Sequence, residues 1–312
     1  MTILDPALLE GVRTIVTHEN CSDGVASALI LVDAIPAARV CFVQHNTTGL
    51  RDLPAEPGML FCDIVPPRER VAEFVDAGAI VLDHHRGARE IVEAFGPRGV
   101  FADEVREPGV SGATLAFRKV WIQIRGSNGL NRPVVERFAT LAGIRDTWQR
   151  PDPRWAEASA QAAALRFWPW ENLRDALWKG GWSAVETMLA IGPVLVAKDA
   201  ERDKVLIREA YRFEAGGHRV ACFEGLQTSD VAEALAGEID LVLGWHYAIV
   251  DGAAKMMISL RGRGSFPLLD FAKRHGGGGH TQAAGFQIAV PPASPDPYTF
   301  LQNLVCRHLE IP

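Results

Sequence analysis

The sequence has little of several features that mark specialised classes of protein. No apolar stretch reaches the roughly 18 uncharged residues that a membrane-spanning helix needs. The beginning, MTILDPALLEGVRTIV, lacks the basic segment and long apolar core of a signal peptide, so we expect a cytoplasmic protein. The five cysteines are odd in number and stand mostly in apolar runs, which predicts reduced thiols without a disulfide framework.

Positive charge is also scarce. The 32 Lys and Arg residues are outnumbered by 38 Asp and Glu residues, and the net charge of −6 excludes a chain that attracts nucleic acid over its whole surface. A polyanionic substrate would have to be bound locally, and the stretch 261–280, with four basic residues against one acid, is able to do so. A chain of 312 residues that is 48% hydrophobic and 22% charged predicts a soluble globular protein with room for two domains.

The first half of the chain alternates strand-like and helix-like segments. Short runs of branched apolar residues predict strands, and amphipathic segments between them predict helices, the first of which would be capped by Ser22. This alternation predicts a doubly wound, mostly parallel sheet with helices on both faces. The predicted strands are 14–18, 39–45, 59–65 and 79–85, and the predicted helices are 22–35, 68–78, 111–124 and 133–146.

The pattern changes twice in the second half. It is helical from 148 to about 212, then rich in strands after Glu214, with a hairpin predicted around Asp251-Gly252. We predict a catalytic domain at 1–192, a connector helix at 193–213, and a smaller α/β domain with a mixed sheet at 214–312. The active-site cleft would lie between the two domains.

Side chains that bind metals follow several of the predicted elements. They are His18 with Asp23, Asp63, the run Asp83-His84-His85, and Asp146 at the end of a helix. In a doubly wound sheet the carboxyl ends of the strands converge on one crevice. Carboxylates and imidazoles gathered there need a partner for their charge, and such mixed ligation suits Mn²⁺ and, less readily, Mg²⁺. Two ions roughly 3.5–4 Å apart would activate a water and stabilise both oxygens of a phosphoryl displacement.

Each of these residues also has an ordinary explanation when taken alone. A single histidine after a strand, such as His18, is more often a surface or hydrogen-bonded residue, and Asp63 is equally able to cap a helix or turn. The sequence Asp-His-His also occurs by chance. The order of the residues and their placement at strand ends, taken together, favour a metal site.

The same segments resemble the motifs of the DHH phosphoesterase family, which includes RecJ-like exonucleases, nano-RNases, phosphoadenosine-phosphate phosphatases and manganese pyrophosphatases. THENCSDGVASA resembles the first motif, FCDIVPP the second and VLDHHRGA the third, and SGATLAF followed by AGIRDTW resembles the fourth. ISLRGRGSFPLLDFAKRHGGGGHTQAAGF resembles the glycine-rich signature of the DHH-associated C-terminal domain. The resemblance covers nearly the whole chain, and its signatures occur in the expected order.

The resemblance implies a set of metal ligands. His18 would bind a first ion and Asp23 a second, and Asp63 would bridge the two ions. His84 and Asp146 would complete the second site. The other two residues of the third motif, His85 and Asp83, are implied as catalytic residues: the former would face the substrate phosphate and the latter would orient a neighbouring imidazole.

One position departs from the common form of the first motif. Many members carry a second aspartate two residues before the one that matches Asp23, and this chain has Cys21 there, between Asn20 and Ser22. A subgroup with an H-x-N-C-x-D-G motif exists, so the site need not be inactive. We expect the first ion to bind more weakly, with a single Mn²⁺ ion or a high demand for Mn²⁺ as the result.

The four consecutive glycines at 276–279 form a second candidate site. They let the backbone approach a ligand closely and point N–H groups at an anion, and guanidinium groups on the preceding strand end suit phosphate. A flexible linker, the alternative, fits poorly between a predicted helix and a predicted strand. Under the resemblance this domain binds the substrate end that is not cut. The predicted substrate contacts are Arg261, Arg263, Gly278, Gly279 and His280.

Six of the eight tryptophans lie between residues 148 and 182. They would either stack on the bases of a single strand or pack helices onto the sheet or a partner subunit, and we favour packing. Trp168 and Trp170, on either side of Pro169, are the pair expected at the surface. We interpret His45, after the second predicted strand, as a surface residue too.

Together these features predict a manganese-dependent phosphoesterase that hydrolyses terminal phosphodiester or phosphomonoester bonds of short oligonucleotides or nucleotides with a metal-activated water. A short substrate fits the acidic charge and the lack of a long basic groove. Two alternatives stay open: a phosphatase of a nucleotide bisphosphate (pAp) or of polyphosphate, and a sensor that binds a nucleotide without hydrolysing it. We expect no membrane partner, and a homodimer is compatible with the sequence.

Overall fold

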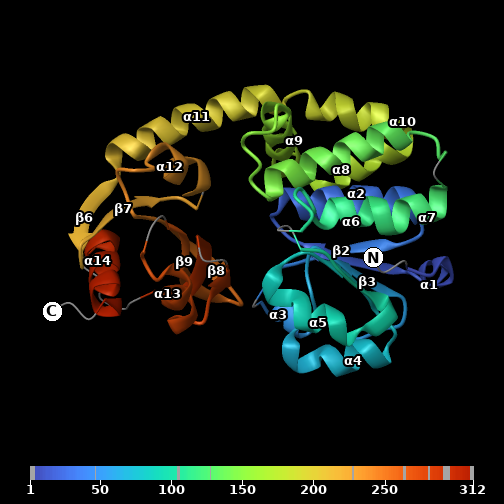
Figure 1. Cartoon of the computed structure of the whole chain (residues 1–312), viewed down its shortest axis with the longest axis horizontal. Helices are drawn as coiled ribbons and strands as arrows, with labels where there is room; N and C mark the ends of the chain where they lie inside the picture. Colours follow the sequence, from blue (N-terminus) through green and yellow to red (C-terminus); the bar gives the residue numbers. More distant parts are fainter. Residues whose placement is uncertain are drawn as a thin grey trace. The chain divides into compact units, whose positions relative to one another are not determined.

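The structure, a computed structural model, describes residues 4–45, 47–103, 106–126, 128–226, 228–262, 265–279, 282–290 and 296–309. It divides into two compact units, Met1–Ala197 and Lys198–Pro312 (Figure 1). The first unit contains a parallel five-stranded sheet and the second a mixed six-stranded sheet, which confirms the predicted α/β class. The cleft expected between the domains stays a prediction.

The sheet of the first unit has the strand order β2-β1-β3-β4-β5, and all its pairs are parallel. Because successive side chains of a strand point to opposite faces, Ile15 and Leu60 enter one core while Val16 and Phe61 enter the other. The chain reverses its winding direction between the neighbours β1 and β3, which is where such sheets bind ligands. The strands are β1 (Thr14–His18), β2 (Arg39–Val43), β3 (Met59–Cys62), β4 (Ile80–Asp83) and β5 (Gly99–Phe101).

Helices cover both faces of this sheet, as predicted. One core lies under α2, α6 and α8, and the other under α3, α4 and α5 (Figure 1). The helices are α1 (Pro6–Glu10), α2 (Ser22–Ala34), α3 (Thr48–Arg51), α4 (Val71–Asp76), α5 (Arg89–Ala94), α6 (Gly112–Ala116), α7 (Ile122–Arg125) and α8 (Arg132–Asp146). Short 3₁₀ turns occur at Arg68–Arg70, Arg86–Ala88 and Gly96–Arg98, and a π-helical segment at Phe117–Trp121 joins α6 to α7.

Three local details differ from the prediction. The N-cap of α2 is Cys21 and not Ser22. Strand β3 ends at Cys62, short of the predicted 65, because Asp63 adopts a left-handed backbone conformation with φ of 63° that no strand accommodates. Strand β5 was not predicted, since three residues are too few to show an alternating pattern.

The rest of the first unit is helical, with α9 (Trp155–Phe167), α10 (Trp170–Leu189) and the start of α11 (Gly192–Glu209). The tryptophans mainly pack: Trp182 donates its Nε1–H to Asp33 Oδ2 at 2.9 Å, and Trp168 donates to the Met188 carbonyl at 2.9 Å. The expectation that Trp168 and Trp170 form the exposed pair is wrong, because both pack against the core. Trp178, with 53% of its surface exposed, is the tryptophan that faces solvent there.

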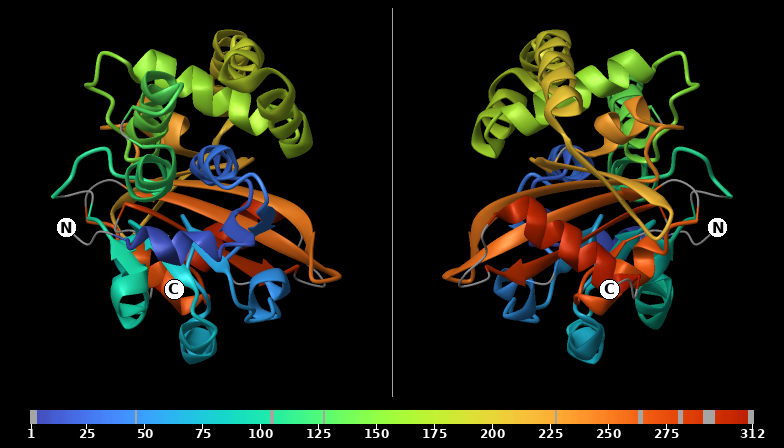
Figure 2. Two further views of the ribbon diagram at one scale, coloured as in Figure 1. Left: turned by 90° about the vertical axis from the view of Figure 1, so that its right-hand side faces the viewer. Right: turned by 90° about the vertical axis from the view of Figure 1, so that its left-hand side faces the viewer.

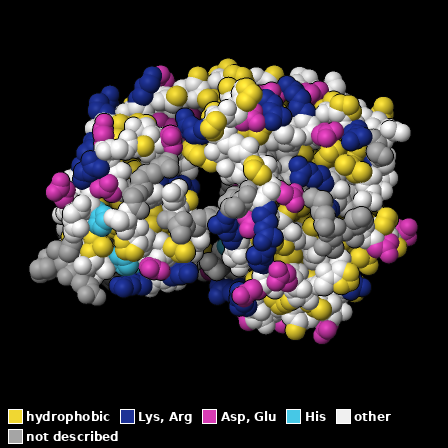
Figure 3. Space-filling view, in the orientation of Figure 1, with side chains coloured by type: hydrophobic (Ala, Val, Ile, Leu, Met, Phe, Trp, Pro, Cys, Tyr) yellow, Lys and Arg dark blue, Asp and Glu magenta, His cyan; other side chains and the backbone are white. Residues whose placement is uncertain are grey.

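The stretch Trp170–Glu209 is long and apolar enough to cross a membrane by length and composition, with a mean hydropathy of 1.3 in its most apolar window. Glu186 and Lys198 interrupt its apolar part, so it is not the uncharged run of about 18 residues whose absence was expected. A single helix of this kind is weak support for a membrane span. The stretch is interrupted at Gly181, where φ is 66° and ψ −164°, and its side chains Leu173, Leu177 and Val185 belong to the core. Hydrophobic side chains show on the surface where α10 meets α11 (Figure 3). Val194, near the start of α11, is 67% exposed.

The sheet of the second unit has the order β10-β11-β9-β8-β7-β6, in which β7 and β8 are parallel and the other pairs antiparallel. The predicted hairpin is present: Asp251 and Gly252, with φ of 52° and 75°, connect β8 to β9 as a tight turn of this kind requires. The strands are β6 (Tyr211–Ala215), β7 (His218–Glu224), β8 (Leu241–Val250), β9 (Ala253–Gly262), β10 (Gly278–Gly279) and β11 (Ala283–Ala289).

Two helices, α13 (Leu268–Arg274) and α14 (Pro297–His308), pack on one core of the second sheet through Phe271, Leu301 and Val305 (Figure 2). A further helix, α12 (Thr228–Ala234), packs on the other core and was not predicted. Helix α11 ends at Glu209 and β6 begins at Tyr211, so the predicted connector 193–213 covers most of α11 and the first residues of β6.

Gly24, near the start of α2, lets the helix lie directly against the end of β1. A methyl group there would be 2.2 Å from the His18 carbonyl oxygen. We expect Gly24→Ala to lower the free energy of unfolding by about 1–3 kcal/mol, as overpacking does, and to displace His18. Gly49→Ala in α3 is the matched control, because its nearest neighbour would be 3.7 Å away. Urea denaturation of both variants checks this, and equal stabilities would contradict it.

Candidate metal centre

The side chains of five predicted ligands meet at the carboxyl ends of β1, β3 and β4 and at the end of α8. His84 Nε2 lies 3.3 Å from Asp63 Oδ1 and 3.4 Å from Asp146 Oδ2, and His18 Nδ1 lies 3.9 Å from Asp63 Oδ2. Three groups have their potential ligand atoms within 4.8 Å of one another. They are His18, Cys21 and Asp63; Asp63, His84 and His85; and Asp23, His84 and Asp146.

Asp63 is central to this cluster. It is 1% exposed, and its N–H donates to the Leu82 carbonyl at 3.1 Å, which fixes the residue at the edge of β4. Its left-handed backbone costs on the order of 1–3 kcal/mol, a cost that tends to occur at functional sites. Within the described part of the chain, Oδ2 is buried without a hydrogen-bond partner. A buried anionic oxygen of this kind requires a cation.

Asp23 is held rigidly from the opposite side. It accepts hydrogen bonds from Ser111 Oγ at 2.7 Å, from the Gly112 N–H at 2.6 Å and from the Ala113 N–H at 3.2 Å, all at the start of α6. A carboxylate has about four acceptor sites, so these three bonds orient Asp23 and still leave room for an ion. Gly112 is required here because a methyl group would lie 2.5 Å from Asp63 Cβ.

The pKa values show how crowded with negative charge the cluster is. Burial, then the charges of Asp63 and Asp146, raise the pKa of Asp23 well above its usual value. Burial opposes ionisation of Asp63 as well, but the hydrogen bond with His84 and the charges of the histidines lower its pKa to about 2. Although burial lowers it, the carboxylates raise the pKa of His84 well above its usual value. Protons thus take the place that a divalent cation would fill, and the donor set suits such an ion.

The sequence did not reveal the support for His18. Its Nε2 lies 2.6 Å from Gln44 Oε1, and since that oxygen only accepts, Nε2 carries a proton and Nδ1 is the ring nitrogen that faces Asp63. His45, interpreted as a surface residue, is exposed, but its ring lies 5.0 Å from that of His18 and 6.4 Å from that of His85. Although the residue as a whole is exposed, desolvation of its ring by these neighbours, then the charges of His18 and His85, lower the pKa of His45 to about 4. Gln44 and His45 have no acid beside them in the sequence, so the pattern used to find the other site residues does not indicate them.

His85 is paired with Asp83. The Asp83 carboxylate, 1% exposed, accepts the His85 backbone N–H at 2.6 Å and lies 2.9 Å from His85 Nδ1. Burial lowers the pKa of His85, but the charge and hydrogen bond of Asp83 raise it to about 9. His85 is therefore cationic at neutral pH, with its Nε2–H directed away from Asp83. The predicted role of His85, a contact to the substrate phosphate, requires this arrangement, in which Asp83 orients the imidazole ring.

The other predicted contacts lie in the second unit. Arg261, in β9, donates to Ser229 Oγ at 2.9 Å and to the Leu260 carbonyl at 2.8 Å. Gly279 has φ of 135° and pairs with β11, where a methyl group would lie 2.4 Å from the Ala283 carbonyl oxygen, whereas Gly278 has open space beside its Cα. The glycines thus have a packing reason as well as the predicted binding one. Arg263 and His280 lie outside the described residues.

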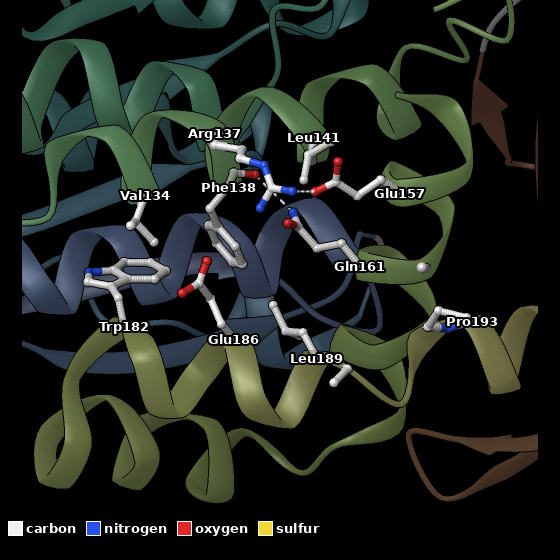
Figure 4. A pocket seen from close by; sticks show the side chains of 12 residues that line it. Val134, Arg137, Phe138, Leu141, Glu157, Gln161, Trp182, Glu186, Leu189 and Pro193 are labelled. Carbon is white, nitrogen blue, oxygen red and sulfur yellow. Dashed lines mark hydrogen bonds and ion pairs between the residues drawn. The ribbon is translucent and has the colours of Figure 1, made fainter. Parts of the chain in front are cut away.

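The first unit also has a cavity of about 230 Å³ between α8, α9, α10 and α11 (Figure 4). Its walls are mainly apolar, with Phe138, Trp182 and Leu189 among them, and an Arg137–Glu157 ion pair lies at one side. None of the predicted site residues lines this cavity.

The chain matches no protein-family model and no curated protein sequence. Its fold is nevertheless similar to that of DHH-domain proteins over almost its whole length. The DHH domain of a protein described as a member of a family of ribosomal proteins is 15% identical, with a TM-score of 0.58 over 98% of this chain and 88% of that one. The pGpG-specific phosphodiesterase PggH from Vibrio cholerae is 15% identical, with a TM-score of 0.53 over 96% of this chain and 100% of that one.

RecJ from Thermus thermophilus, in complex with Mn²⁺, is 17% identical, with a TM-score of 0.50 over 98% of this chain and 54% of that one. At such identities the likeness shows the fold. It confirms the fold that the sequence resemblance implied, and the roles of the individual residues remain predictions.

The Asp83–His85 pair predicts a pH dependence for the metal-free protein. The folded pKa of His85, about 9, lies above the usual value near 6.5. The pair therefore contributes its full stabilisation to the fold below about pH 6.5, and this contribution is lost as the pH rises through 9. We expect Asp83→Asn to bring the His85 pKa, followed by NMR in chelator-treated protein, from about 9 toward 6.5. The difference in free energy of unfolding between the unchanged protein and Asp83→Asn should decrease as the pH is raised from about 6.5 to about 9. A His85 pKa near 6.5 in the unchanged protein would contradict this.

Proposed function

We propose that this protein is a divalent-cation-dependent phosphoesterase that hydrolyses terminal phosphodiester or phosphomonoester bonds of short oligonucleotides or nucleotides, with Mn²⁺ as the favoured ion. The observation that carries the proposal is the buried Asp63 carboxylate, whose two oxygens face His84 and His18 while Oδ2 has no hydrogen-bond partner among the described residues. The DHH-type fold and the position of the cluster beside the β1–β3 switch point support it.

The proposed ligands are His18 and Asp63 for one ion and Asp23, Asp63, His84 and Asp146 for the other. Divalent ions held there would neutralise the charge of the phosphate and lower the pKa of a water molecule. The protein's own groups have separate tasks. The cationic His85, held through Nδ1 by Asp83, would donate from Nε2 to a phosphate oxygen and stabilise the negative charge that develops in the transition state.

Two observations favour a short substrate. The net charge of −6 and the mixture of acidic and basic side chains over the face in Figure 3 offer little attraction to a long polyanion. One fold neighbour that is matched over its whole length, PggH, is a phosphodiesterase specific for the dinucleotide pGpG, which makes a dinucleotide the first substrate to test. We propose that Arg261, Arg263, Gly278, Gly279 and His280 of the second unit bind the part of the substrate that is not cut.

The alternative phosphatase uses the same site. Relative rates on a dinucleotide, on pAp and on polyphosphate separate the two activities, and we expect the dinucleotide to be hydrolysed fastest. The sensor alternative is motivated by Cys21, which stands where an acid is common. Nucleotide binding without turnover in the presence of Mn²⁺, Co²⁺ or Zn²⁺ would favour the sensor and overturn the enzyme.

Asp63→Asn tests the proposal most directly. Asparagine has the same size and tolerates the left-handed backbone, so the fold should persist while the anionic bridge between the ions is lost. We expect kcat on the dinucleotide to fall by at least about 100-fold, since loss of groups that hold a metal has effects of this order or larger. Activity is measured with Mn²⁺ in excess.

Asp175→Asn is the matched control. This acid pairs with Lys179 on the exposed face of α10, and removal of such a surface pair should leave kcat within about twofold of the unchanged protein. If Asp63→Asn hydrolyses the dinucleotide as fast as Asp175→Asn does, the proposed site is wrong.

Arg261→Ala tests the role of the second unit. A guanidinium that binds the uncut part of the substrate equally in ground and transition states affects binding alone, so we expect KM to rise about tenfold with kcat nearly unchanged. Steady-state kinetics on the dinucleotide measures both. Because Arg261 also donates to Ser229 and Leu260, Ser229→Ala serves as the control for lost local packing. An equal rise in KM in both variants would contradict a substrate contact by Arg261.

A further inference from the structure

Cys21 lies inside the candidate metal centre and not merely beside it. Its sulfur belongs to one of the three groups whose potential ligand atoms lie within 4.8 Å of one another, with His18 and Asp63 as the other members. The ligand atoms of a tetrahedral zinc site lie roughly 3.5 Å from one another, so small side-chain rotations would bring these three atoms to ligating distance. The cysteine occupies the position at which many DHH proteins carry an acid.

Two further observations concern the partners of Cys21. Asp63 Oδ2, in a side chain that is only 1% exposed, has no hydrogen-bond partner among the described residues and lies 3.9 Å from His18 Nδ1. His18 Nδ1 is the ring nitrogen left to bind an ion, because Nε2 is held by Gln44 at 2.6 Å. An unpaired carboxylate oxygen and an oriented imidazole nitrogen therefore face the space that the sulfur borders. All three are the atoms through which these residues bind metals.

Cys21 also stands where the backbone favours an anionic sulfur. The residue is the N-cap of α2, a helix of 13 residues, and the N–H groups and dipole at a helix start favour negative charge there. When an ion binds, the S–H bond is replaced by a sulfur–metal bond and the proton is released to solvent.

We propose that Cys21 binds the first ion as a thiolate together with His18 and Asp63, and that this position therefore selects a softer cation such as Zn²⁺, Co²⁺ or Fe²⁺ over Mn²⁺ and Mg²⁺. The inference rests on the proposed function and refines its metal requirement: Mn²⁺ stays the favoured ion of the second position, and the first position takes the softer ion. Thiolate and imidazole ligands favour these ions, whereas carboxylates favour Mn²⁺ and Mg²⁺.

The second group of ligands has a different chemistry. Asp23, His84 and Asp146 offer two carboxylates and one imidazole, a set that suits Mn²⁺. Asp63 belongs to both positions, since Oδ1 faces His84 and Oδ2 faces His18. The two positions are thus chemically unequal, and the exchange of an acid for Cys21 changes the choice of ion at the first position instead of merely weakening it.

Co²⁺ absorption tests this without any assay of activity. Thiolate ligation gives Co²⁺ an intense charge-transfer band in the near ultraviolet that oxygen and nitrogen ligands do not give. We expect chelator-treated protein, titrated with Co²⁺ under reducing, oxygen-free conditions, to develop this band, and Cys21→Ser to bind Co²⁺ without it. Cys41→Ser, a half-buried cysteine of β2, and Cys62→Ala, a buried neighbour of Asp63, are the controls and should keep the band.

Competition between ions supplies a second measurement. We expect the ratio of Zn²⁺ to Mn²⁺ affinity, measured by calorimetry, to fall at least about tenfold in Cys21→Asp, which restores the acid. An unchanged ratio would contradict selection by the thiolate.

The outcomes separate this inference from the proposed function. Co²⁺ binding to the unchanged protein without the charge-transfer band overturns thiolate ligation and leaves the metal-dependent phosphoesterase standing. If the unchanged protein binds neither Co²⁺, Zn²⁺ nor Mn²⁺, both proposals fail. Because the band is sought first in the unchanged protein, poor folding of a variant does not weaken the test.

Discussion

The first unit depends on one electrostatic constraint: the carboxylates of Asp23, Asp63 and Asp146 lie so close together that they cannot all be charged without a cation. Two of them are 1% exposed, so water does not screen their repulsion. The chain holds them there nevertheless, with a left-handed backbone at Asp63 and three hydrogen bonds to Asp23. An arrangement that costs free energy without a ligand supports the proposed cation site.

The fold explains why these groups meet. Parallel strands end at a common edge, and the reversal of winding between β1 and β3 opens a gap there that no crossover helix fills. His18 ends β1, Asp63 follows β3, and His84 follows β4. Residues that are 66 positions apart in the chain, such as His18 and His84, thereby reach the same edge of the sheet.

Much of this could be predicted because it depends on local pattern. Apolar runs that end in a polar residue indicate a parallel strand and its functional end, and that was sufficient to place His18, Asp63 and His84 near one another. Asp146 ends the helix α8, and its place depended on the resemblance to the fourth motif. The contacts of Asp23 with Ser111 and Gly112 could not be derived so, because 88 and 89 residues separate the partners and neither shows a pattern pointing to the other. The left-handed backbone of Asp63 was equally invisible, since it is imposed by β3, β4 and Gly112. The glycines at 277 and 279 have two explanations that the sequence does not separate. Close packing against β11 requires glycine there, and so would the approach of the backbone to a phosphate.

Gln44, the residue just after β2, connects the metal centre to the rim of the sheet. Strand β2 has a neighbour on one side only, and its last pair joins His18 to Val43. A shift of β2 by one residue would turn the Gln44 amide to the opposite face and free the His18 ring to rotate. Fraying at this outermost strand would thus remove the support of the proposed ligand His18 while the interior of the sheet remained folded, which links the candidate site to the stability of the margin of the sheet.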